Sequence, residues 1–414
     1  MPSYNIWTIG CQMNRAESER LAGALAKQGY ALSVSVEQAD LIIINTCVVR
    51  GHAEDKVVNK LANLKALKHK RPEVKIAVTG CFVSGDTAGL HERFPFVDCF
   101  FPAGEVPDWV SLVRPVVEKP GICAYVPIIQ GCDNFCTYCI VPYRRGREKS
   151  RPLAGIVQEI GEMVANGARE VTLLGQNVDS YGHDLPGCPD LADLLVALSG
   201  LSDLWRIRFL TNHPKDMSAR LIQAMADLPP VCESVNLPVQ AGDDDLLRAM
   251  HRGYSVAHYR DLVLMLRSKV SDVAITTDVI VGFPGETEAQ FENTASLLKE
   301  LRFAAVHVAA YSPRTGTAAA RLLDDVPREV KKERLVIIEK QQEAIACEIN
   351  ATLLNTGIEV LVEGRQGGKW RGRGRNDKLV FFTGGEHIMG RLVIVRIDQT
   401  GPWSLQGKLE QIIK

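Results

Sequence analysis

The 414-residue sequence lacks three features that would place it in common classes of protein. It has no stretch near the ~20 consecutive apolar residues that a membrane-spanning helix needs, so we expect no membrane partner. Its first residues, Met1–Ile6, show no basic region with an apolar core behind it, so we expect no secretion signal and a cytoplasmic protein. The net charge of −1 leaves no global excess of cations, so any nucleic-acid surface must be a local patch.

The composition is otherwise that of a folded protein. Apolar residues make up 46% of the chain and charged residues 23%, which is typical of globular domains. The length predicts two or three domains. Eleven cysteines in a chain without an export signal favour reduced thiols and metal ligation over disulfides.

Three closely spaced cysteines dominate the middle of the sequence. Cys132, Cys136 and Cys139 have the spacing C-x3-C-x2-C and follow an apolar run, 124–129, that predicts a buried strand. Thiolates crowded in this way are typical of zinc sites and iron–sulfur clusters. A cubane with three protein ligands would leave one iron open to an outside molecule.

Three competing interpretations of this motif fit less well. Structural zinc would want a fourth Cys or His at close spacing, and none follows before His183. Haem attachment would need a histidine where Ile140 stands. A ferredoxin-type run would supply four thiolates to each cluster.

A second set of cysteines follows three predicted strands in the first third of the chain. Strands predicted near 4–9, 41–44 and 75–78 alternate with helices, which indicates a parallel sheet. Ligand sites of such sheets lie at the carboxyl ends of the strands, where the sequence places Cys11, Cys47 and Cys81. One such cysteine would more often be a core residue, as we interpret Cys99. Three at equivalent positions predict a second cluster site with three protein ligands.

The βα alternation resumes from residue 124 and predicts an incomplete (βα)6 barrel, smaller than the eight-stranded closed form. The predicted strands are 124–129, 170–174, 206–210, 234–237, 273–281 and 304–311. Helices are predicted at 155–166, 191–198, 243–250 and 288–301. Polar loop residues follow these strands, and each is as consistent with ordinary loop polarity as with a site: Gln176, Asn177, Gln240 and Arg314. His213 is a weaker candidate, because a lone histidine before a proline is more often a turn residue than a base. We name none of them catalytic.

The last third predicts one long helix, 326–350, and a small antiparallel barrel of short strands at 358–362, 379–382, 392–397 and 404–409. Residues 358–414 hold ten Lys or Arg against six Asp or Glu. In this module the run 369–375 sets an aromatic residue among cations, with glycines that allow close backbone approach. This combination suits the binding of a flexible RNA better than a merely solubilising loop. A second basic run, 143–151, follows the central cysteines. The predicted RNA contacts are Arg144, Arg145, Arg147, Lys369, Trp370, Arg371, Arg373 and Arg375.

The C-x3-C-x2-C motif at the start of a βα barrel resembles the radical S-adenosylmethionine (SAM) enzymes. The order of the three parts resembles the methylthiotransferases over essentially the whole chain, and the last module resembles their TRAM domain. The segments Gly10–Asn14, Thr46–Arg50 with Ala53–Lys56, and Leu174–Val178 with Tyr181–Gly182 are similar to the MiaB branch. The resemblance implies a three-layer parallel α/β domain at 1–117, a radical-SAM domain at 118–350 and a TRAM RNA-binding domain at 351–414.

The resemblance also implies the cofactors: two [4Fe–4S] clusters and SAM. Tyr138 would lie beside the adenine of SAM, and the Gly282–Glu286 turn would line the same pocket. We predict SAM-binding roles for Tyr138, Gln176, Asn177, Gln240, Gly282 and Arg314.

The implied reaction adds a methylthio group to carbon 2 of an isopentenylated adenosine next to the anticodon of tRNA (position 37). One SAM would methylate a sulfur at the Cys11–Cys47–Cys81 cluster, and the other would be cleaved at the Cys132–Cys136–Cys139 cluster to give the radical that removes the adenine hydrogen. The implied partners are the tRNA anticodon stem-loop, an electron donor such as flavodoxin or ferredoxin, and a sulfur source. Two alternatives remain open: a methylthiotransferase for threonylcarbamoyl-adenosine tRNA or a ribosomal-protein aspartate, and an iron–sulfur RNA-binding sensor without turnover.

Overall fold

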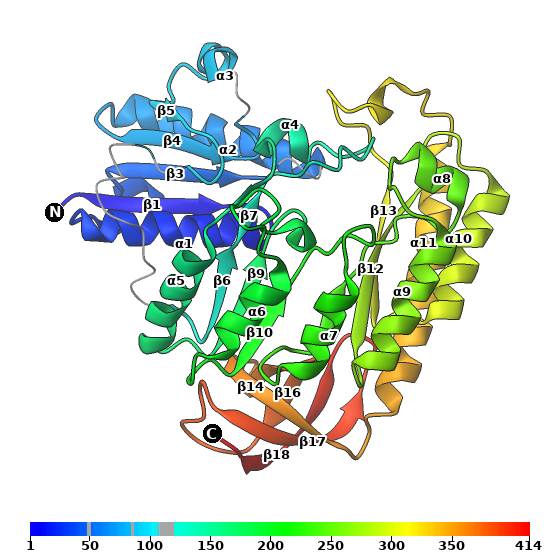
Figure 1. The fold of residues 1–414 in the computed structure, drawn as a ribbon. Coiled ribbons are helices and arrows are strands. Elements are labelled where there is room, and N and C mark those ends of the chain that lie inside the picture. Colours follow the sequence, from blue (N-terminus) through cyan, green and yellow to red (C-terminus); the bar gives the residue numbers. More distant parts are fainter. Residues whose placement is uncertain (48–50, 84–86, 106, 108–119) are drawn as a thin grey trace. The chain divides into compact units, whose positions relative to one another are not determined.

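In the computed structural model the chain is described at residues 1–47, 51–83, 87–105, 107 and 120–414. These residues divide into two compact units (Figure 1). The first unit comprises Met1–Phe135, Cys139–Gly167 and Leu173–Gln176, and the second comprises Cys136–Tyr138, Ala168–Thr172 and Asn177–Lys414. The predicted domain boundary at 117/118 and the motif residues Val48, Val49 and Arg50 lie outside the described residues.

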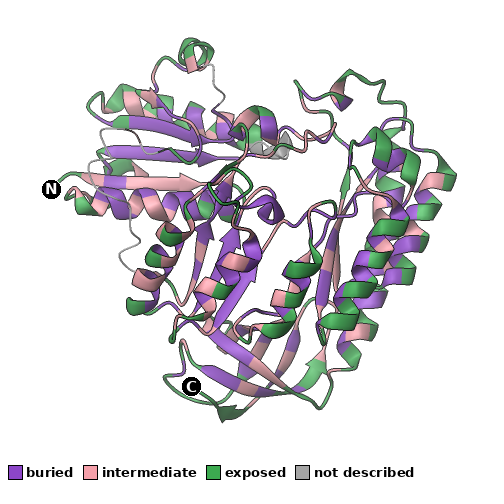
Figure 2. Cartoon of the chain, in the orientation of Figure 1, coloured by how far each residue is buried: buried purple, intermediate pink, exposed green. Residues whose placement is uncertain are grey.

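A five-stranded parallel sheet with the strand order β2-β1-β3-β4-β5 forms the centre of the first unit. Every residue of β3 is buried, because both faces of the sheet are covered (Figure 2). The three strands predicted from the sequence are β1, β3 and β4, and the two-residue strands β2 and β5 extend the sheet at its edges. The strands are β1 (Ser3–Thr8), β2 (Ala31–Leu32), β3 (Leu41–Thr46), β4 (Lys75–Gly80) and β5 (Cys99–Phe100).

Helices cover both faces of this sheet, as the alternating pattern predicts. On one face, α1 (Gln12–Lys27) packs Leu21 and Leu25 against Ile43 of β3. On the other face, Leu61 of α2 (Gly51–Lys70) packs with Ile44, and Leu90 of α3 (Thr87–Arg93) packs against the same cluster. The result is the predicted three-layer arrangement, with the carboxyl ends of β1, β3 and β4 at one edge.

The rest of the first unit carries Cys132 and Cys139 of the central cysteine motif. The predicted strand 124–129 is in fact two strands, β6 (Cys123–Pro127) and β7 (Ile129–Gln130). The break falls at Ile128, whose amide donates to the Leu174 carbonyl and whose carbonyl accepts from Arg151. This turns β7 to pair with β8 (Lys149–Ser150). The intervening loop ends in the short helix α4 (Val141–Arg145), and α5 (Leu153–Ala165) follows β8.

The second unit contains the remaining βα repeats, close to their predicted positions. Strands β11, β12 and β13 form a parallel sheet, and β9 neighbours β10 in another. The strands are β9 (Glu170–Leu174, its last two residues in the first unit), β10 (Arg206–Phe209), β11 (Ser234–Asn236), β12 (Ala274–Val281) and β13 (Ala305–Ala310). The helices are α6 (Leu191–Ser199), α7 (Ala219–Asp227), α8 (Asp244–Ala249), α9 (Val256–Lys269) and α10 (Glu288–Leu301). Of these, α7 and α9 were not predicted.

The predicted long helix is α11 (Arg328–Ala351), which begins after Pro327. Beyond it a closed barrel has the strand order β14-β15-β16-β18-β17. Its strands are β14 (Gly357–Gln366), β15 (Lys369–Gly374), β16 (Leu379–Thr383), β17 (Leu392–Thr400) and β18 (Leu405–Ile412). Strands β16 and β18 run parallel, so the barrel is not wholly antiparallel as predicted.

Most of the basic run 369–375, for which no strand was predicted, forms the strand β15, paired with β14 and β16. Its glycines serve close packing, because a Cβ at Gly372 would lie 2.0 Å from the carbonyl oxygen of Leu361. Among the helices in the described part of the chain, none is long and apolar enough to cross a membrane.

Candidate functional site

The three N-terminal cysteines follow adjacent parallel strands and leave the sheet at the same edge. Cys11 follows β1, Cys47 follows β3 and Cys81 follows β4, and the amide of Cys81 donates to the Thr46 carbonyl over 2.8 Å. Cys47 and Cys81 are buried, whereas Cys11 is exposed. A Cβ added at Gly10 would lie 2.9 Å from the Cβ of Cys47, so the segments that carry Cys11 and Cys47 touch.

Two buried asparagines, Asn14 and Asn45, hold this edge together. The side-chain amide of Asn14 donates to Oδ1 of Asn45 over 2.8 Å and to the Thr46 carbonyl over 3.0 Å. Its Oδ1 accepts from the backbone N–H of Cys11 and lies 3.3 Å from the Cys11 Sγ. Asn45 returns a bond to the Asn14 carbonyl over 2.8 Å. Sequence reasoning missed both residues, although each stands within three residues of a predicted ligand.

The electrostatics of Cys81 reflect its neighbours. Burial raises the pKa of the Cys81 thiol above its ordinary value, the Arg145 guanidinium opposes that rise, and the nearby Cys47 adds to it. The Nε of Arg145 donates to the Cys81 Sγ over 3.2 Å. Arg145 is therefore not a surface RNA contact as predicted, because its side chain is 2% exposed and paired with Glu17.

The backbone next to Cys81 requires glycine at position 80. Its φ is +92°, and a Cβ there would lie 2.2 Å from the Thr46 carbonyl oxygen, the acceptor of the Cys81 amide. We expect Gly80→Ala to lower the free energy of unfolding by more than about 2 kcal/mol, since steric overlap adds to the cost of a left-handed backbone. Chemical denaturation measures this loss.

Gly29→Ala is the matched control, because Gly29 has φ +82° and nothing lies within 4 Å of the added Cβ. Backbone strain alone should cost it about 1 kcal/mol. Equal losses in the two variants would contradict the role of close packing at Gly80.

The central cysteines lie in the loop between β7 and α4. In the first unit, the amide of Cys132 donates to the Gly146 carbonyl over 3.2 Å, and Nδ2 of Asn134 lies 3.6 Å from the Cys132 Sγ. The amide of Gly131 donates to Oε1 of Gln176 over 2.7 Å. Cys139 follows half-buried before α4. Gln176, predicted as a cofactor contact, thus anchors the base of the cysteine loop.

Cys136 belongs to the second unit, where a buried arginine meets it. Nη1 of Arg252 lies 3.3 Å from the Cys136 Sγ and 3.4 Å from the hydroxyl of Tyr138. The same guanidinium donates to Tyr254 and to the Pro238 carbonyl. The sequence did not predict a role for Arg252. This residue follows α8 and stands 116 positions after Cys136, and no motif near it indicates a contact with that cysteine.

The other predicted cofactor residues have varied surroundings. Asn177 is buried and donates to Asp216 over 2.7 Å. Gln240 has φ +69° and bonds through its backbone to Asp278 and Ile280. Gly282, with φ +69°, donates to Oε2 of Glu286 over 2.6 Å. Arg314 is half-buried.

A buried polar group adjoins Asn177. Burial raises the pKa of Asp179 to about 7, against bonds donated by the Asn212 side chain and the His213 amide. Burial lowers the pKa of His213 to about 2, and the cations of Arg252 and Lys215 add to that effect. His213 is therefore a neutral, buried imidazole at physiological pH.

The predicted RNA contacts of the barrel divide into buried and accessible residues. Trp370 lies in the barrel core, donates to the Gly385 carbonyl and is covered by Arg365, so its ring cannot stack on a base as predicted. Arg375 forms a bidentate pair with Glu233 and donates to the Val231 carbonyl. Arg375 therefore connects the barrel to residues 231–233 of the same unit and does not contact RNA as predicted. Partly exposed cations remain at Lys369, Arg371 and Arg373.

Two arginines of β10, which the sequence did not single out, also bind the barrel through hydrogen bonds. Arg206 is fully buried and donates to the Arg373 carbonyl and to Glu359. Arg208 donates to the Gly374 carbonyl and pairs with Glu170.

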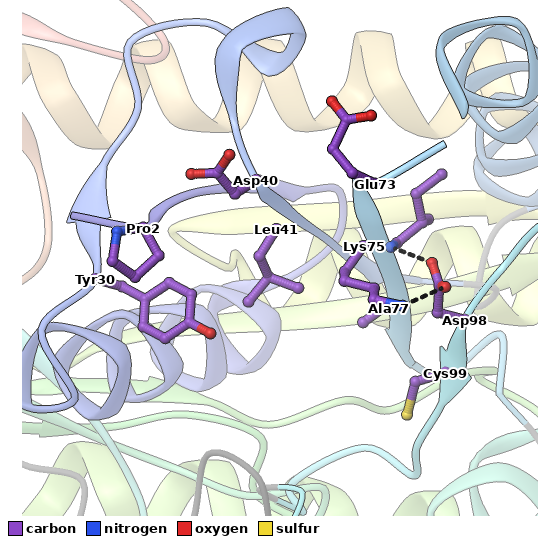
Figure 3. A pocket seen from close by; sticks show the side chains of 10 residues that line it. Pro2, Tyr30, Asp40, Leu41, Glu73, Lys75, Ala77, Asp98 and Cys99 are labelled. Atoms are coloured by element: carbon purple, nitrogen blue, oxygen red, sulfur yellow. Dashed lines mark hydrogen bonds and ion pairs between the residues drawn. The ribbon is translucent and has the colours of Figure 1, made fainter. Parts of the chain in front are cut away.

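A cavity of about 420 Å³ lies at the opposite edge of the first-unit sheet, where the strands begin (Figure 3). Its lining includes Tyr30, Leu41, Ala77 and Cys99. At its rim Lys75 pairs with Asp98 over 3.4 Å. It is thus separate from the cysteine edge.

The cysteines are not gathered as ligands of one ion. Within the described ranges, no group of three or more His, Cys, Asp or Glu side chains could hold a single metal ion. Ligands of a cubane stand further apart than those of one ion, because each thiolate binds a different iron.

Comparison with known families divides the chain into three matched segments. Residues 3–102 match the family described as uncharacterized protein family UPF0004, residues 126–298 match the radical SAM superfamily, and residues 352–409 match the TRAM domain.

Full-length relatives carry a specific name. A protein of Dehalococcoides mccartyi strain 195 is 54% identical, with all of both chains covered, and one of Roseiflexus sp. (strain RS-1) is 48% identical over 98% of this chain and 89% of its own. Both are named tRNA-2-methylthio-N(6)-dimethylallyladenosine synthase.

Solved structures share the fold at low identity. The radical SAM methyltransferase TsrM of Kitasatospora setae, solved with cobalamin and a [4Fe–4S] cluster, has a TM-score of 0.54 at 13% identity and covers 77% of each chain. The cobalamin-dependent radical enzyme OxsB has a TM-score of 0.53 at 12% identity and covers 82% of this chain and 56% of its own.

Proposed function

The chain belongs to the tRNA-2-methylthio-N(6)-dimethylallyladenosine synthase family, and we propose that it is a radical SAM transferase that adds a methylthio group to carbon 2 of isopentenylated adenosine next to the anticodon. One observation carries this proposal above the others. A chain 54% identical to a named relative over its full length holds two separate sets of three cysteines. Two sets suit a reaction that needs both a radical and a sulfur.

We assign Cys11, Cys47 and Cys81 as ligands of one [4Fe–4S] cluster. The donor set suits it, since three thiols at one strand edge can each bind a different iron. Hydrogen-bond donors near ligand sulfurs are typical of cluster sites, and Arg145 supplies one at Cys81. Asn14 and Asn45 would keep the loops that carry Cys11 and Cys47 in place.

We assign Cys132, Cys136 and Cys139 as ligands of the second cluster. In the first unit Asn134 lies beside Cys132, and in the second unit Arg252 lies beside Cys136. When bound, the two clusters and SAM supply the radical and the methylated sulfur that side chains cannot provide.

The predicted SAM-binding residues have two kinds of role in this proposal. Tyr138 stands directly before Cys139 and next to Arg252, which suits a contact with the cofactor. Gly282, Gln240 and Arg314 follow barrel strands at their carboxyl ends, where ligands of such barrels bind. Gln176 and Asn177 already have protein partners and would act by shaping the loops.

The substrate is tRNA, and the contacts we propose with it are local. Arg147 is exposed next to the cysteine loop, and Arg144 precedes it on α4. On the barrel, Lys369, Arg371 and Arg373 remain candidates for phosphate contacts. We further propose the anticodon stem-loop as the bound region, a flavodoxin or ferredoxin as electron donor, a separate sulfur source and a cytoplasmic location.

A substrate comparison tests the function directly. The anaerobically reconstituted protein is incubated with reductant, sulfide, SAM and either isopentenylated or threonylcarbamoylated tRNA, and the nucleosides are analysed by mass spectrometry. We expect a 2-methylthio product from the isopentenylated tRNA alone. Product from the threonylcarbamoylated tRNA would favour the related specificity. Loaded clusters that yield no 5′-deoxyadenosine would favour the sensor.

A further inference from the structure

Arg145 is a buried cation whose role the predicted RNA surface does not explain. It is the last residue of α4, six positions after Cys139, and its side chain is 2% exposed. Burying a guanidinium is costly unless each charged group around it is paired. The partners of Arg145 therefore indicate what this position is for.

The guanidinium divides its donors between two partners in the first unit. Nη1 donates to Oε1 of Glu17 over 2.6 Å, and Nη2 lies 3.4 Å from Oε2 of the same carboxylate. Nε points the other way and donates to the Cys81 Sγ over 3.2 Å. Glu17 itself is 8% exposed and lies on α1.

This geometry goes beyond an ion pair between two helices. If the pair served only to join α1 and α4, the arginine could donate all its N–H groups to the carboxylate or to backbone carbonyls. In this structure Glu17 binds both terminal nitrogens of the guanidinium. Because the guanidinium is planar and rigid, this contact also sets the direction of the Nε–H bond. The Nε–H donor is aimed at a sulfur that adjoins Cys47.

We propose that Arg145 is a positioning residue of the N-terminal three-cysteine site, with Glu17 holding its guanidinium so that Nε–H donates to the Cys81 thiolate. This inference rests on the proposed function only in taking Cys81 as a cluster ligand. A cationic N–H donor stabilises the more negative, reduced cluster more than the oxidised one. Arg145 therefore raises the reduction potential of this site, and Glu17 moderates the effect by balancing its charge.

The test uses the full-length chain with Cys132, Cys136 and Cys139 all replaced by alanine, so that one cluster site remains. Arg145→Gln, Glu17→Gln and Lys149→Gln are introduced separately. Lys149 is an exposed cation of the same segment and serves as the control for charge loss alone. Iron and sulfide content and an EPR-monitored redox titration are measured for each protein.

We expect shifts of opposite sign from the two partners. Arg145→Gln removes the donor and the cation, so the midpoint potential should become more negative. Glu17→Gln leaves the cation uncompensated, so the potential should become more positive. Lys149→Gln should match the parent. A pair that only stabilises the fold would change the cluster content of the variants without shifting the potential of the loaded protein.

Several outcomes would overturn the proposal. Unchanged potentials in both variants, or shifts of the same sign, would do so. If Arg145→Gln fails to fold by circular dichroism, Glu17→Gln decides, since a positive shift supports the role and no shift contradicts it. A parent chain that assembles no cluster contradicts the proposed function itself, whereas unchanged potentials in a loaded parent contradict only the role of Arg145.

Discussion

Replacing Cys136 with alanine is expected to abolish the formation of 5′-deoxyadenosine from SAM. The change removes one of three proposed thiolate ligands and leaves the buried Arg252 without its sulfur partner. A group with no substitute in the reaction typically costs at least about 10³-fold in rate when it is lost. The measurement is 5′-deoxyadenosine by chromatography after anaerobic incubation with dithionite and SAM.

Cys347→Ala is the matched control for this loss. Cys347 is an exposed cysteine of α11, outside both three-cysteine sets. It should form 5′-deoxyadenosine at the rate of the unaltered protein. Normal cleavage by Cys136→Ala would show that the central motif is not where SAM is split.

Cys47→Ala is expected to separate the two chemical steps. It should still cleave SAM, because the central cysteines are intact, but 2-methylthio product should fall by at least about 10³-fold. Cys47 is buried, directly after β3 and near Cys81, and it is one of the three proposed ligands of the sulfur-holding site. Both products are measured in one reaction with isopentenylated tRNA.

Cys99→Ala controls for damage to the same domain. Cys99 is a half-buried residue of the same sheet, and it is the first residue of β5 instead of following a carboxyl end. We expect both products to be retained. The division of labour between the two sites would be wrong if Cys47→Ala formed the 2-methylthio nucleoside.

Features that repeat locally were predictable from the sequence. The apolar runs of β1, β3 and β4, each followed by a cysteine, predicted a parallel sheet with its ligands at one edge, and that sheet is confirmed. The barrel helix α10 spans its predicted residues, 288–301, because its 3.6-residue period is uninterrupted.

Features that depend on distant partners were not predictable. Arg145 looked like one cation of a solvated run, and its partner Cys81 is 64 residues away. Arg375 meets Glu233 across 142 positions. Because the sequence does not reveal which surface covers a cation, both were interpreted as RNA contacts.

The strand β15 shows a signal that was present but misread. Trp370, Gly372 and Gly374 alternate with cations, and they are the buried positions of the strand. Buried and partly exposed residues therefore alternate along β15 with the period of two that is typical of a strand, and the glycines face the barrel core. The glycines were interpreted as allowing close backbone approach to RNA, whereas Gly372 lies against the backbone of Leu361.

The most direct measurement follows both uses of SAM in one reaction. The unaltered, reconstituted protein is incubated with isopentenylated tRNA and SAM whose methyl group is deuterated. We expect the 2-methylthio product to carry the deuterated methyl group and to accumulate together with 5′-deoxyadenosine. Product with an unlabelled methyl group, or product formed without 5′-deoxyadenosine, would contradict the assignment of a sulfur site and a radical site to this chain.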